Sequence, residues 1–113
     1  MKTIIAGGRD CLDMQVLLKA VESCPFEITE VVSGCARGAD TLGEKWGESK
    51  RLPIHKYSAD WNKYGKAAGH IRNTFMADNA EALLALWDGS SRGTKHMIDT
   101  ATKKGLQVFV WRY

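Results

Sequence analysis

Short apolar segments alternate with segments whose apolar side chains recur every three or four positions, and this alternation runs through the whole chain. The pattern is typical of strand–helix–strand units around a parallel sheet, because strands buried on both faces are continuously apolar and the covering helices are amphipathic. We expect five strands, at residues 2–6, 28–33, 54–57, 82–87 and 107–111. Four helices are expected between them, at residues 13–23, 39–50, 70–78 and 94–104.

Right-handed crossovers would join these elements into a three-layer α/β/α, doubly wound, Rossmann-like sheet with strand order 3-2-1-4-5. The 113 residues are enough for a single domain, residues 1–113, and leave no room for a second. The crevice between the carboxyl ends of the first and fourth strands is where such sheets bind ligands. The fifth strand lies at an edge and ends in Trp111 and Tyr113, so we expect a homo-oligomer unless a helix or loop covers that edge.

The composition excludes several classes of protein. No apolar run reaches the roughly 20 residues that span a bilayer, and the apolar part of the N-terminus is too short for a secretion signal. We therefore expect a cytoplasmic protein without a membrane partner. Three widely spaced cysteines without a CxxC pair predict reduced thiols, and we expect no metal and no cofactor. The net charge of +3 tolerates an anionic ligand but is weak support for a nucleic-acid surface.

Three predicted strand-to-helix loops each combine glycine with arginine: residues 7–9 (GGR), 33–40 (SGCARGAD) and 88–94 (DGSSRGT). Glycine lets the backbone approach an anion, and free N–H groups at a helix start, aided by the helix dipole, point toward it. Three such loops at one crevice favour a phosphate ligand. The alternative is that glycine serves tight turns and that the arginines are solvated or pair with neighbouring aspartates. Neither a Walker motif nor the complete GxGxxG fingerprint is present.

Side chains of these loops can add bidentate contacts and hydroxyl donors to a phosphate. The candidates are Arg9, Arg37, Arg92, Ser33, Ser90, Ser91 and Thr94.

Residues 50–72 carry six basic side chains and one acidic side chain, which predicts a distinctly positive surface region. Within it, residues 58–69 form the longest irregular stretch, where Trp61 and Tyr64 can stack on a nucleobase or pack as a lid. Arg72 and Asn73 follow near the start of the next predicted helix. A cation there opposes the helix dipole, so Arg72 has either an external anion or a surface salt bridge as its partner.

Candidate catalytic groups are few. The three histidines have no spacing that marks a metal site or a triad. Asp40 and Asp88 stand in the second and third glycine loops, where each can accept a hydrogen bond from a ribose, cap or brace its own loop, or act as a general base. Asp60, in the irregular basic stretch, is a third candidate base, and the sequence does not rank the three.

Four segments, IIAGGRD, VVSGCARGAD, ADWNKYGKAAGHIRN and LWDGSSRGTKHMI, together resemble a small family of unknown function within the SLOG superfamily, often encoded by phages or prophages. That superfamily includes the Lonely Guy phosphoribohydrolases and the Smf-type DNA-processing proteins, whose SGxARGxD pattern is similar to residues 33–40. The resemblance implies a Rossmann-like fold that binds a nucleotide or nucleotide-derived ligand, with roles in phage conflict or nucleotide signalling. The binding positions it implies are Gly7, Gly8, Arg9, Ser33, Gly34, Arg37, Gly38, Asp40, Arg72, Asn73, Asp88, Gly89, Arg92, Gly93 and Thr94.

The chain departs from the Lonely Guy enzymes at their PGGxGTxxE motif. Gly93 and Thr94 match its GT, but Met97 stands at the position of the catalytic glutamate, and residues 89–91 (GSS) replace PGG. A thioether can neither carry negative charge toward an oxocarbenium centre nor move a proton, so this departure argues against N-glycosidic hydrolysis.

Our leading hypothesis is a domain that senses or sequesters a nucleotide-derived ligand, with phosphate on the three loops and a base or ribose under Trp61 and Tyr64. An enzyme acting on the same ligands, a nucleoside monophosphate N-glycosidase using Asp88 or Asp40, is the first alternative. Binding of single-stranded nucleic acid through residues 50–72 is the second, and the modest net charge places it last.

Overall fold

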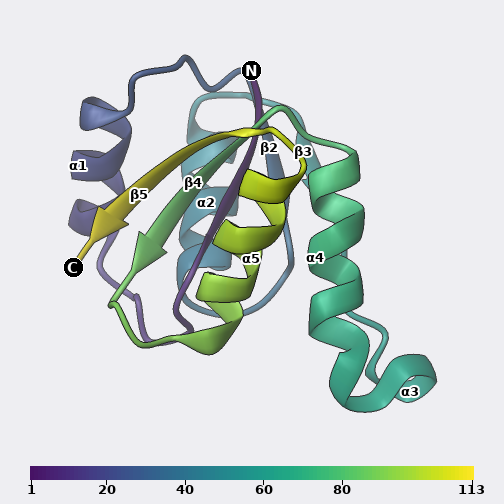
Figure 1. Ribbon diagram of the computed structural model, residues 1–113. Coiled ribbons are helices and arrows are strands. Elements are labelled where there is room, and N and C mark those ends of the chain that lie inside the picture. The colour runs from purple at the N-terminus through teal and green to yellow at the C-terminus, as the bar shows by residue number, and fades with distance from the viewer.

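The computed structural model describes residues 1–113 and confirms the predicted α/β architecture (Figure 1). One parallel sheet has the strand order β3-β2-β1-β4-β5. Its strands are β1 (Lys2–Gly7), β2 (Glu30–Ser33), β3 (Ile54–Lys56), β4 (Ala82–Trp87) and β5 (Gln107–Arg112). The helices are α1 (Met14–Ser23), α2 (Ala39–Ser49), the short α3 (Trp61–Tyr64), α4 (Ala68–Asp78) and α5 (Arg92–Lys103), with a 3₁₀ turn (Gly65–Ala67) between α3 and α4.

The two faces of the sheet bury separate cores, because successive residues of a strand point to opposite faces. In β4, Leu84 and Leu86 pack on the side of α1 and α2, whereas Leu83 and Ala85 pack on the side of α4 and α5. All four side chains are completely buried, as expected for a central strand covered on both faces. This packing produces the expected three layers, with two long helices on each face of the sheet (Figure 1).

Residues 58–69 are more regular than their composition predicts, so the expectation of a long irregular stretch is wrong. The segment contains α3 and the 3₁₀ turn, and α4 begins at Ala68 rather than at residue 70. Asp60 starts α3, because its carboxylate accepts a hydrogen bond from the backbone N–H of Lys63 at 3.1 Å. The earlier start of α4 moves Arg72 out of the first turn, so the argument from the helix dipole does not apply to it.

The basic stretch at residues 50–72 does not form a single surface, contrary to expectation. Lys50 follows α2, whose eleven residues extend about 16 Å, so Lys50 lies at the end of the sheet opposite to the glycine loops. Lys56 forms an ion pair with Glu44 at 3.6 Å. Lys66 and Arg72, in contrast, line a cavity at the carboxyl edge. The positive charge is therefore divided between opposite ends of the sheet.

Strand β5 lies at an edge of the sheet, as predicted, and most of its side chains are only partly buried. Association of two copies through this edge stays a prediction. None of the helices is sufficiently long and apolar to cross a membrane.

A polar cavity at the carboxyl edge of the sheet

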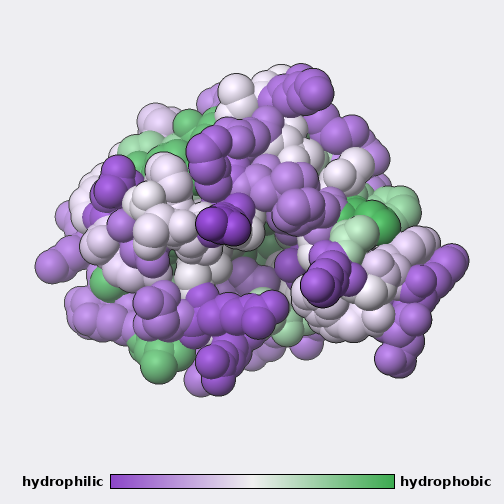
Figure 2. Space-filling view, turned by 60° about the horizontal axis from the view of Figure 1, so that its bottom comes forward, coloured by the Kyte–Doolittle hydropathy of each residue, from purple (hydrophilic) through white to green (hydrophobic).

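A cavity of about 490 Å³ opens at the carboxyl end of β1. It lies between the loop that follows β1, the first turns of α2 and α5, and one face of α4. The carboxyl edge faces the viewer in Figure 2, where hydrophilic side chains surround the hollow. The cavity stands where a doubly wound sheet has its ligand crevice.

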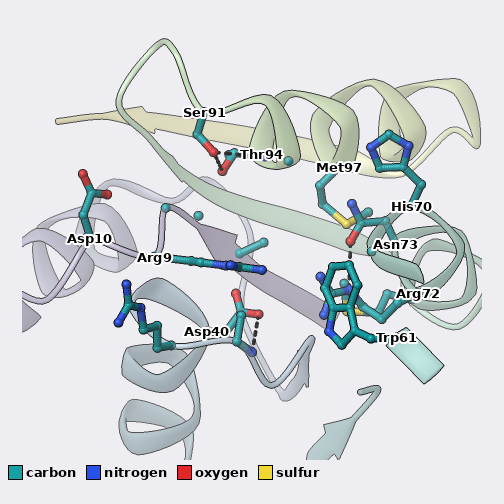
Figure 3. A pocket seen from close by; sticks show the side chains of 18 of the residues that line it. Arg9, Asp10, Asp40, Trp61, His70, Arg72, Asn73, Ser91, Thr94 and Met97 are labelled. Atoms are coloured by element: carbon teal, nitrogen blue, oxygen red, sulfur yellow. Dashed lines mark hydrogen bonds between the residues drawn. The ribbon is translucent and has the colours of Figure 1, made fainter. Parts of the chain in front are cut away.

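The loop after β1 supplies Arg9, which extends across the cavity (Figure 3). The backbone N–H groups of Gly8 and Arg9 donate to no acceptor in the chain. A Cβ on Gly7 would collide with the carbonyl of Leu86, and a Cβ on Gly8 would stand 2.6 Å from the hydroxyl of Tyr113. Gly7 is therefore required by the packing of the chain itself, whereas the atoms nearest to a Cβ on Gly8 are the ends of the Asp10 and Tyr113 side chains, which can move.

Several amides of the loop after β2 have acceptors within the chain. The N–H of Ala39 donates to the carbonyl of Gly8 at 3.1 Å, and the N–H of Ala36 donates to Oδ2 of Asp40, also at 3.1 Å. Gly38 has a φ of 82°, and a Cβ there would collide with the backbone of Gly8 and Arg9. This loop is thus locked against the first loop by backbone contacts that only glycine permits.

Ser33 lies outside the cavity, although we expected it among the binding residues. Its side chain is completely buried, and its hydroxyl donates to Glu44 Oε2 at 2.6 Å and accepts from the N–H of Cys35 at 3.2 Å. Both polar functions of the hydroxyl are occupied by the chain.

The loop after β4 is braced by Asp88, whose Oδ1 accepts the N–H groups of Ser90 and Ser91, both at 2.8 Å. These two hydrogen bonds are the main reason that the pKa of Asp88 lies below its usual range. The side chain of Ser91 caps α5 and contacts the hydroxyl of Thr94 at 3.0 Å. Loop bracing, one of the alternatives for Asp88, is therefore what the structure displays.

Only part of the third loop reaches the cavity. Ser91, Gly93 and Thr94 line it. Four predicted binding residues of this loop lie outside the lining, namely Asp88, Gly89, Ser90 and Arg92.

The wall opposite Arg9 is a hydrogen-bonded chain of side chains on α4 and α5. Arg72 Nη1 donates to the carbonyl of Gly34, and Arg72 Nε donates to Asn73 Oδ1 at 3.0 Å. Asn73 Nδ2 donates to Nδ1 of His96 at 3.1 Å, and His96 stacks on His70 with 3.8 Å between ring centroids. Burial lowers the pKa of Arg72, and burial together with His70 lowers the pKa of His96.

Asp40 is a buried carboxyl group on the cavity lining, with only 6% of the residue exposed. Burial raises its pKa to about 6, against the opposing effects of the Ala36 N–H and of Arg72. The Ala36 N–H binds Oδ2 of Asp40, and no hydrogen bond of the chain reaches Oδ1. Asp40 can therefore accept a hydrogen bond from a ligand hydroxyl or exchange a proton near neutral pH.

The cavity brings together four basic side chains, Arg9, Arg37, Lys66 and Arg72, with two carboxyl groups, Asp10 and Asp40. The ion pairs of the chain involve other cations, so these arginines do not pair with neighbouring aspartates. Trp61 lines the mouth and is 52% exposed, whereas Tyr64 does not line the cavity.

Several lining residues were not anticipated from the sequence. His70 is one, because its partner His96 lies on another helix and no local spacing marks the pair. Met97 was noted only as a departure from a motif, and it forms part of the lining as a buried thioether. The others are Ala6, Asp10, Ala36, Lys66, Gly69 and Met76. No three His, Cys, Asp or Glu side chains lie close enough together to hold a metal ion.

The strand order and the cavity at the carboxyl edge of the sheet place the chain among Rossmann-like α/β domains. More narrowly, the chain belongs to the YspA, cpYpsA-related SLOG family (YAcAr), which it matches over residues 1–64.

Its relatives include phage and prophage proteins. The Gene 61 protein of Mycobacterium phage D29 is 38% identical over 117 residues, which cover 95% of this chain and 93% of that protein. The uncharacterized SPbeta prophage-derived protein YoqJ of Bacillus subtilis is 36% identical over 62 residues, 52% of this chain and 36% of YoqJ. No solved structure matches the chain significantly.

Proposed function

We propose that this protein binds a nucleotide-derived small molecule in the cavity at the carboxyl edge and acts by sensing or sequestering it. The proposal rests on one observation: a cavity of about 490 Å³ is lined by four cations without ion-pair partners, an exposed indole and a buried carboxyl group that can accept a hydrogen bond from a hydroxyl. Cavities of roughly 300–1,000 Å³ are typical of sites for small molecules and cofactors. Phosphate requires the cations, a base can stack on Trp61, and a ribose hydroxyl can donate to Asp40. Membership of the SLOG family supports a nucleotide-related ligand.

Titration calorimetry with AMP, ADP-ribose, NAD and cyclic nucleotides tests this proposal. At least one compound is expected to bind, and Arg9→Ala should weaken that binding by about tenfold or more, since it removes a charge that spans the cavity. Lys19→Ala is the matched control, because Lys19 is exposed on α1, away from the cavity. Silence across the panel would overturn the proposal.

Hydrolysis of a nucleotide N-glycosidic bond is the second candidate function. The observation that favours it is the carboxyl group of Asp40, which lies on the cavity lining with a pKa of about 6 and so can serve as acid or base near neutral pH. Asp88, the other candidate, lies outside the lining. Release of free base from a nucleotide library, lost in Asp40→Asn and retained in Asp88→Asn, would identify an enzyme. Binding without release of base would identify a binding domain.

A further inference from the structure

A second hollow of about 330 Å³ adjoins the cavity. The two share Arg9, Arg37, Arg72, Trp61 and the backbone at Ala36. Arg9, Arg72 and Trp61 thus stand between two compartments of one site, and a ligand of sufficient length can occupy both.

The two compartments differ in charge. The second hollow is lined by three arginines and no carboxyl group, whereas the first adds Lys66 but also Asp10 and Asp40. Because a carboxylate repels phosphate at short range, an anion has lower energy in the second hollow than beside Asp40. The hydroxyl of Ser58, exposed on the same lining, adds a donor.

The two compartments also differ in hydrogen-bonding groups. The first hollow offers Asp40 Oδ1 as an acceptor for a hydroxyl or amino group, because no hydrogen bond of the chain reaches this atom, whereas Asn73 Oδ1 already accepts from Arg72. At the start of α5, the amides of Ser90, Ser91 and Thr94 are already bound by Asp88 and Ser91, so this helix offers fewer donors to phosphate than the sequence suggested. Three arginines without a carboxyl group on one side, and the Asp40 carboxyl group as an acceptor on the other, give the site a direction.

We propose that the second hollow binds the phosphate or pyrophosphate end of the ligand, while the first binds its ribose and base. This assignment rests on the proposed function and places the anion beside Cys35 and Ser58 rather than at the N-terminus of α5. The ligand class is then a nucleotide whose anionic end is directed away from α5.

Two aspartate substitutions compare the two locations, with inorganic pyrophosphate as the probe. Ser58 lines only the second hollow, and Ser91 lines only the first. Ser58→Asp should weaken pyrophosphate binding by about tenfold or more, because it places a carboxylate among the three arginines. Ser91→Asp should change it by less than about threefold, and the fold is retained because aspartate caps helices as well as serine does. Ser58→Asn controls for the change of shape.

Alkylation of Cys35 provides a second measurement. Cys35 is exposed and lines the second hollow, whereas Cys24 is partly buried at the C-terminal end of α1 and Cys11 is buried. Saturating pyrophosphate should slow the reaction of Cys35 with iodoacetamide and leave that of Cys24 unchanged. Iodoacetamide is neutral and is not itself repelled by the anion, so slower reaction would report on pyrophosphate bound beside the thiol.

The outcomes separate this inference from the proposed function. If pyrophosphate binds and Ser58→Asp weakens its binding, but no nucleotide binds, the assignment of the anion to the second hollow stands and the proposed function is wrong. Nucleotide binding that is weakened more by Ser91→Asp than by Ser58→Asp, or equally by both, would overturn the direction of the ligand and retain the function. If neither probe binds, both proposals are wrong.

Discussion

Arg72 and Gly34 are 38 positions apart, and the guanidinium of Arg72 donates a hydrogen bond to the carbonyl oxygen of Gly34. This contact ties α4 to the loop after β2 and holds the cation at the boundary between the two hollows. The same guanidinium contacts Asn73, so the positive charge is positioned from two elements.

Gly34→Ala should displace Arg72 without unfolding the protein. A Cβ on Gly34 would stand 2.6 Å from Arg72 Nη1 and 2.9 Å from Asp40 Oδ2, and both are ends of side chains that can move. We expect pyrophosphate affinity to fall about tenfold, while the free energy of unfolding falls by only about 1–2 kcal/mol. Calorimetry and urea denaturation measure the two quantities.

A double-mutant cycle with Arg72→Ala decides whether Gly34 acts through Arg72. If it does, Gly34→Ala should weaken pyrophosphate binding no further once Arg72 is removed. Additive losses would show that Gly34 acts by another route.

Gly38→Ala should destabilise the protein much more than Gly105→Ala. The two glycines have nearly equal positive φ angles, 82° and 80°, so alanine adds backbone strain of about 1–2 kcal/mol or more at each, and the ψ of −127° at Gly38 adds to the strain there. At Gly105 the Cβ meets nothing within 4 Å, whereas at Gly38 it collides with the backbone of Gly8 and Arg9. We expect an excess loss of about 1–3 kcal/mol for Gly38→Ala in urea denaturation. Equal losses would contradict the tight contact between the two loops.

Asp40→Asn should stabilise the protein at neutral pH. Folding raises the pKa of Asp40 from 3.8 to about 6, so the folded state holds the proton more tightly between these values. The free energy of unfolding therefore falls as the pH rises from about 4 to 6, and the loss is complete above 6. At 1.36 kcal/mol per pKa unit, Asp40→Asn should gain about 3 kcal/mol at pH 7 and little at pH 4, as measured by urea denaturation.

Asp88→Asn is the opposite case and serves as the comparison. Hydrogen bonds from two amides lower the pKa of Asp88, so its ionised form stabilises the fold above the usual pKa, and this effect disappears as the pH falls through the lowered value. Asp88→Asn should thus lower the free energy of unfolding at pH 7, and in acid the variant and the original protein should have similar free energies of unfolding. A matching pH profile for the two variants would refute the assigned environments.

His96 should titrate below the ordinary histidine range. Burial and the neighbouring His70 lower its pKa, although Asp99 acts in the other direction, and neutral Nδ1 is needed to accept from Asn73. His70→Gln removes the stacked ring and opens His96 to solvent, so the pKa of His96 should rise toward 6.5. NMR titration of the imidazole protons measures it. An unchanged pKa would contradict the stacked arrangement.

Most of the fold could be predicted because its determinants are local. The continuous apolar run of β4 required cover on both faces, and the order of strands and helices required a doubly wound sheet. Helix α3 and the early start of α4 were not predicted, because the composition of residues 58–69 is typical of loops and the hydrogen bond by which Asp60 caps α3 is not evident from it.

The candidate site was only partly predictable. The sequence placed Arg9, Arg37, Asp40 and Arg72 at one edge, and these residues do line the cavity. It left open whether Asp88 and Asp40 brace their own loops, as both do, and it did not reveal that Ser33 is turned toward Glu44. Local patterns determine helices, strands and their order through side-chain periodicity and turn chemistry. Which donor binds which acceptor depends on distances between segments far apart in the chain, and only the tertiary structure decided that.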